Sequence, residues 1–149
     1  MRLWLPLAAA LPLAAQTPAK PPLVKAPGDP VTLQLFANSL PDRAPLGLQW
    51  EVVYPAQLMD LEGKPEAGRA AVNSGESIEC KPRKEYSFIC VLSGGSKPIG
   101  DGQIAVFHFR IHADAISGKV TLRIQSASAR QKDNSEATLK NTESVFIIH

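Results

Sequence analysis

Apolar and polar residues alternate along several stretches of this chain after residue 30. Five segments have this alternation: 31–35, 46–54, 104–111, 120–124 and 145–148. A period of two is typical of a β-strand that buries one face and leaves the other in water. Parity places Trp50 and Tyr54 on the buried face, together with Phe107 and Phe109 of a later strand. The pattern therefore predicts a core enclosed between strands.

Turn-forming residues separate these segments at short intervals. Glycine, proline and serine cluster at 93–98 and 100–102, and Pro55 ends the second strand. The stretch 56–61 after this proline is long enough only for a helical turn, and no segment has the period of a long amphipathic helix. We therefore expect an all-β fold, an antiparallel β-sandwich, in one domain that spans 31–149.

The first sixteen residues have the composition of a secretory signal peptide. Arg2 precedes an apolar run that ends in small residues near Ala15 and Gln16. The run is shorter than the roughly 20 apolar residues that a spanning helix needs, and no later segment is apolar enough to cross a bilayer. We expect residues 1–16 to be removed and the protein to be exported, to the periplasm, the cell surface or the extracellular medium.

Residues 17–30 differ from the domain that follows them. Five prolines fall within these fourteen residues. Proline removes a backbone donor and favours an extended chain, so the segment is interpreted as a tether. Residues 23–25 are apolar enough to form a short first strand at a sheet edge inside it.

The two cysteines predict one disulfide. An even cysteine count in an exported chain favours a disulfide over a metal site or a redox pair. Pairing them across an antiparallel hairpin, with Ile78 opposite Leu92, gives a face that is wholly apolar or sulfur. That face comprises Ile78, Cys80, Pro82, Phe88, Cys90 and Leu92. Two free buried thiols are the alternative.

Charge and titratable residues exclude several classes of function. The 16 basic and 14 acidic residues nearly cancel, and no extended basic run could follow a nucleic-acid backbone. His108, Arg110 and His112 share the outward face of one strand, where residues four apart are separated by about 13 Å, too far to bind one metal ion. No catalytic motif occurs. We expect neither an enzyme nor a metal or cofactor site.

Three segments of the chain resemble the cohesin family. In 48–58 an alternating strand ends in Tyr54 before a proline turn, and in 98–109 an Asp-Gly turn leads into the next alternating strand. The stretch 27–33 is similar to the family's opening, a Pro-Gly turn followed by a strand. The resemblance extends to the related cellulose-binding modules. It implies a jelly-roll sandwich of about nine strands in two sheets.

The expected disulfide is a departure from the well-studied cellulosomal cohesins. It resembles a cohesin-like branch in other exported bacterial proteins. In the resembled fold, the sheet that holds the third, fifth, sixth and eighth strands contacts the partner. By motif position, its outward residues here are Gln49, Glu51, Glu79, Lys81, Ile89, Val91, Thr121 and Arg123.

Ile89 and Val91 are the apolar pair of this expected face. They point outward if Cys90 points inward, and an apolar pair rimmed by charges is typical of a protein interface. The sequence leaves two alternatives open. A loop or the C-terminal strand covers the pair, or the two residues are ordinary exposed side chains.

Two classes of function follow from the resemblance. The first is a protein-interaction module whose partner is a dockerin-like or other surface-assembly protein, with polysaccharide degradation as one setting. The second is a carbohydrate-binding module on the same fold, which needs exposed aromatic rings that stack on sugars. Trp50 and Tyr54 have inward parity, and Tyr86 is the aromatic residue expected at the surface. The sequence therefore favours a protein partner over a glycan.

The export hypothesis predicts where the mature protein begins. Because the apolar run ends in small residues, we expect the first residue of exported material to be Gln16 or Thr17. Intact mass spectrometry of the exported protein measures this directly. A mass that includes the first sixteen residues would contradict it.

Overall fold

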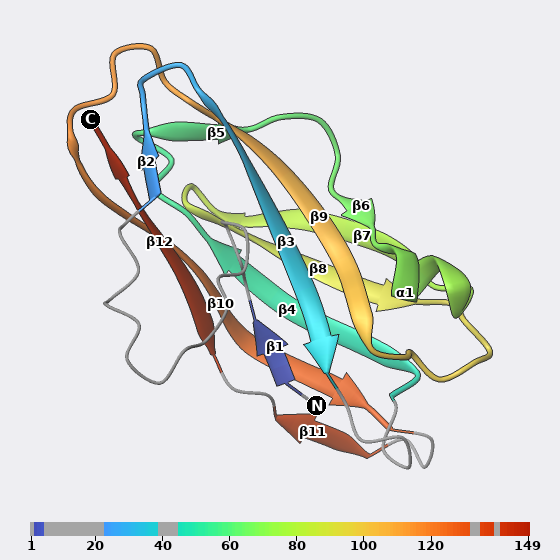
Figure 1. The fold of residues 1–149 in the computed structure, drawn as a ribbon. Helices are drawn as coiled ribbons and strands as arrows, with labels where there is room; N and C mark the ends of the chain where they lie inside the picture. The colour runs from blue at the N-terminus through green and yellow to red at the C-terminus, as the bar shows by residue number, and fades with distance from the viewer. Residues whose placement is uncertain (1, 5–22, 39–44, 132–134, 139–140) are drawn as a thin grey trace, which may run out of the picture.

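A computed structural model describes residues 2–4, 23–38, 45–131, 135–138 and 141–149 of the chain. Nearly all regular structure in these residues is β-strand (Figure 1). The elements in chain order are β1 Arg2–Trp4, β2 Leu23–Lys25, β3 Pro30–Asn38, β4 Gly47–Val53, β5 Met59–Leu61, β6 Glu66–Ala67, α1 Arg69–Asn73, β7 Ser77–Lys84, β8 Ser87–Ser93, β9 Gly102–Ile111, β10 Gly118–Arg130, β11 Glu136–Thr138 and β12 Thr142–Ile148.

The described strands form two sheets that face each other. The five-stranded sheet has the order β1-β3-β9-β5, with β6 also paired to β9. The seven-stranded sheet has the order β2-β12-β10-β4-β8-β7, with β11 also paired to β10. All pairings are antiparallel except that of β2 with β12. The predicted all-β antiparallel sandwich is confirmed.

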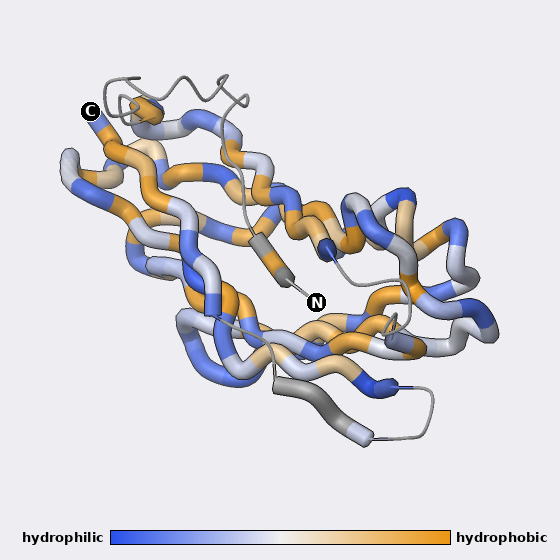
Figure 2. The backbone as a smooth tube through the Cα atoms, turned by 60° about the horizontal axis from the view of Figure 1, so that its bottom comes forward, coloured by the Kyte–Doolittle hydropathy of each residue, from blue (hydrophilic) through white to orange (hydrophobic). Residues whose placement is uncertain are grey.

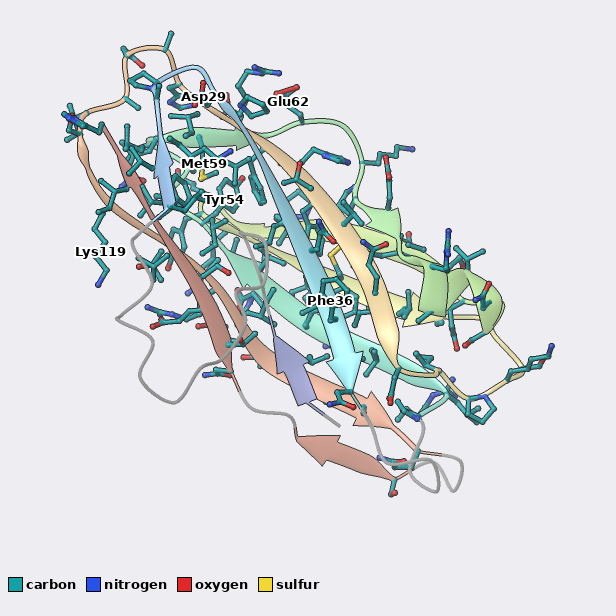
Figure 3. The ribbon with its side chains drawn as sticks, viewed as in Figure 1. Asp29, Phe36, Tyr54, Met59, Glu62 and Lys119 are labelled. Carbon is teal, nitrogen blue, oxygen red and sulfur yellow. A yellow bond between two sulfur atoms is a disulfide. The ribbon has the colours of Figure 1, made fainter. Side chains whose placement is uncertain are left out.

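The core lies between the two sheets and follows the predicted parity. Figure 2 shows hydrophobic and hydrophilic residues alternating along the strands, as a sandwich with two wet outer faces requires. Trp50 on β4 meets Phe107 on β9 edge to face, with ring centroids 6.5 Å apart. Tyr54 is half-buried and packs on Phe88 and Phe109 at 5.8 and 5.3 Å. In Figure 3 its side chain lies near Met59 at one end of the core.

The segment between β4 and β9 differs from the sequence prediction. The expected helical turn is limited to residues 56–58, where the amides of Leu58 and Met59 both donate to the Pro55 carbonyl, and residues 59–61 form β5 instead. The short helix α1 was not predicted. It packs on β9 because Gly68 brings the backbone against Gln103, where a Cβ atom would lie only 2.4 Å from the Gln103 carbonyl oxygen.

The structure describes only part of the predicted signal peptide and tether. Residues Arg2–Trp4, inside the predicted signal peptide, form β1 and pair with the end of β3, and Leu3 reaches the core. Leu23–Lys25 forms β2 at the edge of the seven-stranded sheet. The remainder of the predicted leader and of the tether lies outside the described residues. No described helix has the length and apolar character needed to cross a membrane.

The hairpin of β7 and β8 has the predicted register. Cys80 lies opposite Cys90, Ile78 opposite Leu92, and the two cysteines form a disulfide. Cys90 also lies opposite the fully buried Trp50 of β4. The bond therefore ties the edge strand β7 to the centre of the core.

The disulfide can be tested by peptide mapping without reductant. Trypsin cleavage after the exposed residues Arg83 or Lys84 separates the two cysteines in the chain, so the flanking peptides should stay joined until reductant is added. Because the bond closes a short loop, reduction should lower the free energy of unfolding by about 2–3 kcal/mol. Full alkylation of both cysteines in unreduced protein would contradict the pairing.

The outer face of the five-stranded sheet carries a ladder of charge pairs along β9. His112 Nε2 lies 3.0 Å from Asp60 Oδ2, and Arg110 forms an ion pair with Glu62. His108 Nε2 lies 3.8 Å from Glu66 Oε1, and its Nδ1 lies 3.5 Å from Thr32 Oγ1. These acids lie on the segment from β5 to β6. The three outward residues that the sequence placed together thus hold this segment to β9, and no cluster of metal ligands occurs among the described residues.

The His112–Asp60 pair predicts a pH dependence of stability near neutrality. The hydrogen bond to Asp60 raises the pKa of His112, despite a smaller opposing effect of desolvation. A raised folded-state pKa gives stability that is fully present below the ordinary value of 6.5 and is lost as pH rises through the folded value. Asp60→Asn should remove most of this dependence in denaturant melts between pH 5.5 and about 8. Glu62→Gln, which alters the neighbouring Arg110 pair, is the control and should keep it.

Candidate binding face

The face proposed from the sequence is the outer surface of β7, β8, β4 and β10, which are neighbours in the seven-stranded sheet. We call it the outer β4 face. Cross-strand pairs place its residues in rows. Val91 lies between Glu79 and Gln49, while Ile89 lies between Lys81 and Glu51. The seven site residues predicted from the sequence therefore all have outward parity on one continuous surface: Gln49, Glu51, Glu79, Lys81, Ile89, Val91 and Arg123.

Accessibility differs among these residues. Gln49, Glu79, Lys81 and Arg123 are exposed, and 37% of the Val91 surface is accessible. Ile89 is half-buried, as is the flanking Thr121. No described loop or strand covers Val91, so an accessible apolar residue with polar neighbours lies on this face.

Glu51 corrects the sequence prediction. It has the expected outward parity, yet only 2% of its surface is accessible. Arg83 Nη1 and Gln125 Nε2 both donate hydrogen bonds to its Oε1, at 2.8 and 2.9 Å. These two side chains cover the carboxylate from either side, so Glu51 cannot itself contact a partner in this arrangement.

Two irregularities of the sheet put Arg83 and Gln125 in place. The pairing of β7 with β8 shifts register between Pro82 and Lys84, at Arg83. The pairing of β10 with β4 shifts after Gln125, where Ser126 has a φ of 52°. Bulges of this kind redirect side chains and often lie near functional sites. Alternation alone could not reveal these irregularities, so Arg83 and Gln125 were not predicted from the sequence.

The surroundings of Glu51 keep it ionised. Burial by itself raises the pKa of this carboxyl. The Gln125 amide, the Ser87 hydroxyl and the Arg83 guanidinium together lower the pKa by more than burial raises it, so the net shift is downward. Ser87 Oγ contributes without a hydrogen bond of regular geometry. Glu51 and Arg83 therefore form a charged pair at neutral pH. Arg83 stays partly in water, with 47% of its side chain accessible.

Two hollows open on the seven-stranded sheet. One, of about 150 Å³, is lined by Gln49, Val91, Ser93, Ser128 and Arg130 with parts of their neighbours. The other, of about 660 Å³, is lined by Arg123, Gln125, Asn141, Thr142 and Glu143. No described residue that lines either hollow is aromatic. The large exposed aromatic residue among the described residues is Tyr86, which lies in the β7–β8 turn with Lys84 Nζ 5.7 Å from its ring centre.

Comparison with known proteins supports the fold. No family model matches the sequence, and no curated protein matches it. Solved structures do. A type I cohesin from Clostridium thermocellum, solved in complex with a dockerin, superposes with a TM-score of 0.70 at 19% identity, over 86% of this chain and 94% of that one.

Two further similar structures are a cohesin module of a glycoside hydrolase and a non-cellulosomal cohesin. A cohesin module of a family 33 glycoside hydrolase from Clostridium perfringens has a TM-score of 0.70 at 16% identity, over 85% of this chain and 90% of that one. A non-cellulosomal cohesin from Archaeoglobus fulgidus has a TM-score of 0.67 at 14% identity, over 86% of this chain and 87% of that one. The chain therefore has a cohesin-like fold.

Proposed function

We propose that this protein is an exported, non-catalytic binding module that holds a protein partner on the outer β4 face. The observation that carries the proposal is the contrast between the two outer faces. On the five-stranded sheet, the outward charges of β9 are each engaged with an acid of the β5–β6 segment. On the outer β4 face, Val91 is exposed and Lys81, Glu79 and Gln49 surround it. Exposed apolar residues with a polar rim are typical of protein interfaces.

A protein partner fits this face better than a glycan. Sugar recognition on a flat sheet relies on aromatic rings exposed to the ligand. The rings of Trp50 and Phe107 are buried in the core, and Tyr86 lies at a hairpin turn instead of on the face. The carbohydrate-binding alternative therefore has little support among the described residues.

The class of partner is inferred from the fold. Cohesin structures with this fold have been solved with dockerins bound. By analogy, the partner is a dockerin-like or another surface-assembly protein outside the cytoplasm. A cohesin module within a glycoside hydrolase supports polysaccharide degradation as one setting.

A substitution at Val91 tests the location of the site. The partner is first captured from the native envelope or culture fluid with the unsubstituted domain as bait. Val91→Glu places a charge at the accessible apolar position, so the captured partner should bind this variant at least tenfold more weakly. Because the side chain is exposed, the melting temperature should change by only a few degrees. Ile89 is half-buried opposite Glu51 and is left intact, since a new charge there would disturb the fold as well.

The matched control lies on the other sheet. Arg110→Ala changes an exposed strand residue on the outer face of β9 and should leave binding unchanged. Loss of binding in Arg110→Ala with full binding in Val91→Glu would move the site to the five-stranded sheet. If both variants bind the partner with full affinity, neither outer face is the binding site and the proposal is wrong.

A further inference from the structure

The charged cluster around Glu51 carries an inference about the chemistry of the partner. It rests on the proposed function, because it concerns the same outer β4 face. We infer that Arg83 is a preset anchor for a carboxylate of the partner, and that Glu51 is the residue that positions it. The partner surface that docks here is then acidic.

The geometry of two strands holds Arg83 in place. Arg83 lies at the irregularity in the edge strand β7, and its guanidinium reaches the carboxylate of Glu51 on β4, with the strand β8 between them. A long side chain loses freedom when it is held in this way, and here that ordering is already present before any partner arrives. The guanidinium has five N–H donors, of which Nη1 serves Glu51, and nearly half of the side chain is accessible.

The accessible charge on this face is mainly positive. Of the two acids on the outward face of β7 and β4, Glu51 is buried and paired, so Glu79 is the one that a partner can reach. Lys81 and Arg83 are exposed on β7, while Arg123 and Lys119 are exposed on β10. Lys119 extends away from the sheets in Figure 3. Glu143 of β12 lies opposite Arg123 and offsets part of this charge.

The backbone beside the cluster departs from regular strand conformation. Gln125 donates to the same oxygen of Glu51 as Arg83 does, from the point where β10 leaves regular pairing. Ser126 holds a φ of 52°, in the left-handed region that non-glycine residues seldom adopt. Strand irregularities on both sides of Glu51 thus fix the carboxylate that orients Arg83. A carboxylate on the partner would pair in a bidentate way with the donors of this fork that no described residue accepts.

The inference can be tested with defined peptides before the partner is known. An acetylated, amidated tetraglutamate peptide and its tetralysine counterpart are titrated into the isotope-labelled protein at low ionic strength, and NMR shifts are followed. Tetraglutamate should perturb the Arg83 Nε–H and the backbone amides of Ile89 and Val91, and tetralysine should not. Preference for tetralysine, or perturbation only of His108 and Arg110 on the opposite sheet, would overturn the inference.

Substitution of the anchor gives the expected size of the effect. Arg83→Gln should weaken tetraglutamate binding about tenfold, the effect expected from a charge-assisted hydrogen bond. Arg110→Gln removes an arginine that is also paired with a glutamate, but on the other sheet, and should change affinity less than twofold. Arg83→Gln leaves Glu51 buried without its cation and could unfold the protein. Arg83→Lys therefore serves as the second variant, keeping the charge but losing the fork, and should also bind more weakly.

Two isosteric variants separate positioning from net charge. Glu51→Gln and Glu79→Gln each make the face more positive by one charge. Among the described residues, however, Arg83 pairs with Glu51 and not with Glu79. If Glu51 positions Arg83, Glu51→Gln should bind tetraglutamate several-fold more weakly, whereas Glu79→Gln should bind it equally or more tightly. Tighter binding by both variants would reduce the effect to simple charge attraction and overturn the positioning role.

The outcomes also separate this inference from the proposed function. If Val91→Glu abolishes binding of the captured partner while tetraglutamate leaves the Arg83 signals unchanged, the face binds its partner by other chemistry. In that case only the acidic-partner inference fails. If Val91→Glu retains the captured protein, the proposed face itself is wrong, whatever the peptides do.

Discussion

The register of β8 is the constraint on which most of this structure depends. Side chains alternate along a strand, so a shift of one residue would turn every side chain of β8 to the opposite face. The strand lies between β4 and β7, and Cys90 is the position where both neighbours hold it. On one side Cys90 faces Trp50, fully buried against Phe107, and on the other it is bonded to Cys80.

The same register determines what the protein presents to solvent. With Phe88, Cys90 and Leu92 in the core, Val91 must face outward next to Gln49 and Glu79. Side-chain packing on the inner face therefore determines the chemistry of the outer face. The core and the proposed binding surface are opposite faces of the same three strands, β4, β8 and β7. A substitution in the core is therefore expected to affect the outer face mainly by shifting the strand register.

Much of the fold could be predicted from the sequence, because alternation with a period of two shows which face of a strand each side chain occupies. Regular strands of a sandwich keep that assignment. Alternation correctly predicted Trp50 as buried, His108 as outward and the pairing of Cys80 with Cys90. It failed where a local departure from regular geometry decides the outcome. Glu51 has the parity of an exposed residue, but it is buried by Arg83 and Gln125, which reach it from the irregularities in β7 and β10.

Other features escaped prediction for a related reason. Helix α1 has five residues and β6 has two, too short for any period to emerge. Their conformation depends on tertiary packing, such as the close approach of Gly68 to Gln103 on β9. Residues 59–61 also became a strand because β9 was available as a partner, which no local preference could foresee.

The edge strand β7 limits how any other chain can approach the molecule. An open edge normally offers a row of unpaired backbone groups that another strand can extend into a continuous sheet. Here Pro82 has no amide hydrogen, the register shift beside it breaks the spacing of the backbone groups, and Lys81, Arg83 and Lys84 concentrate like charge along the rim. Lateral growth into fibres or edge-to-edge dimers is thereby disfavoured at this end of the sheet. If the proposed face binds a partner, it does so through side chains on the flat surface, where specificity can change by substitution without altering the backbone.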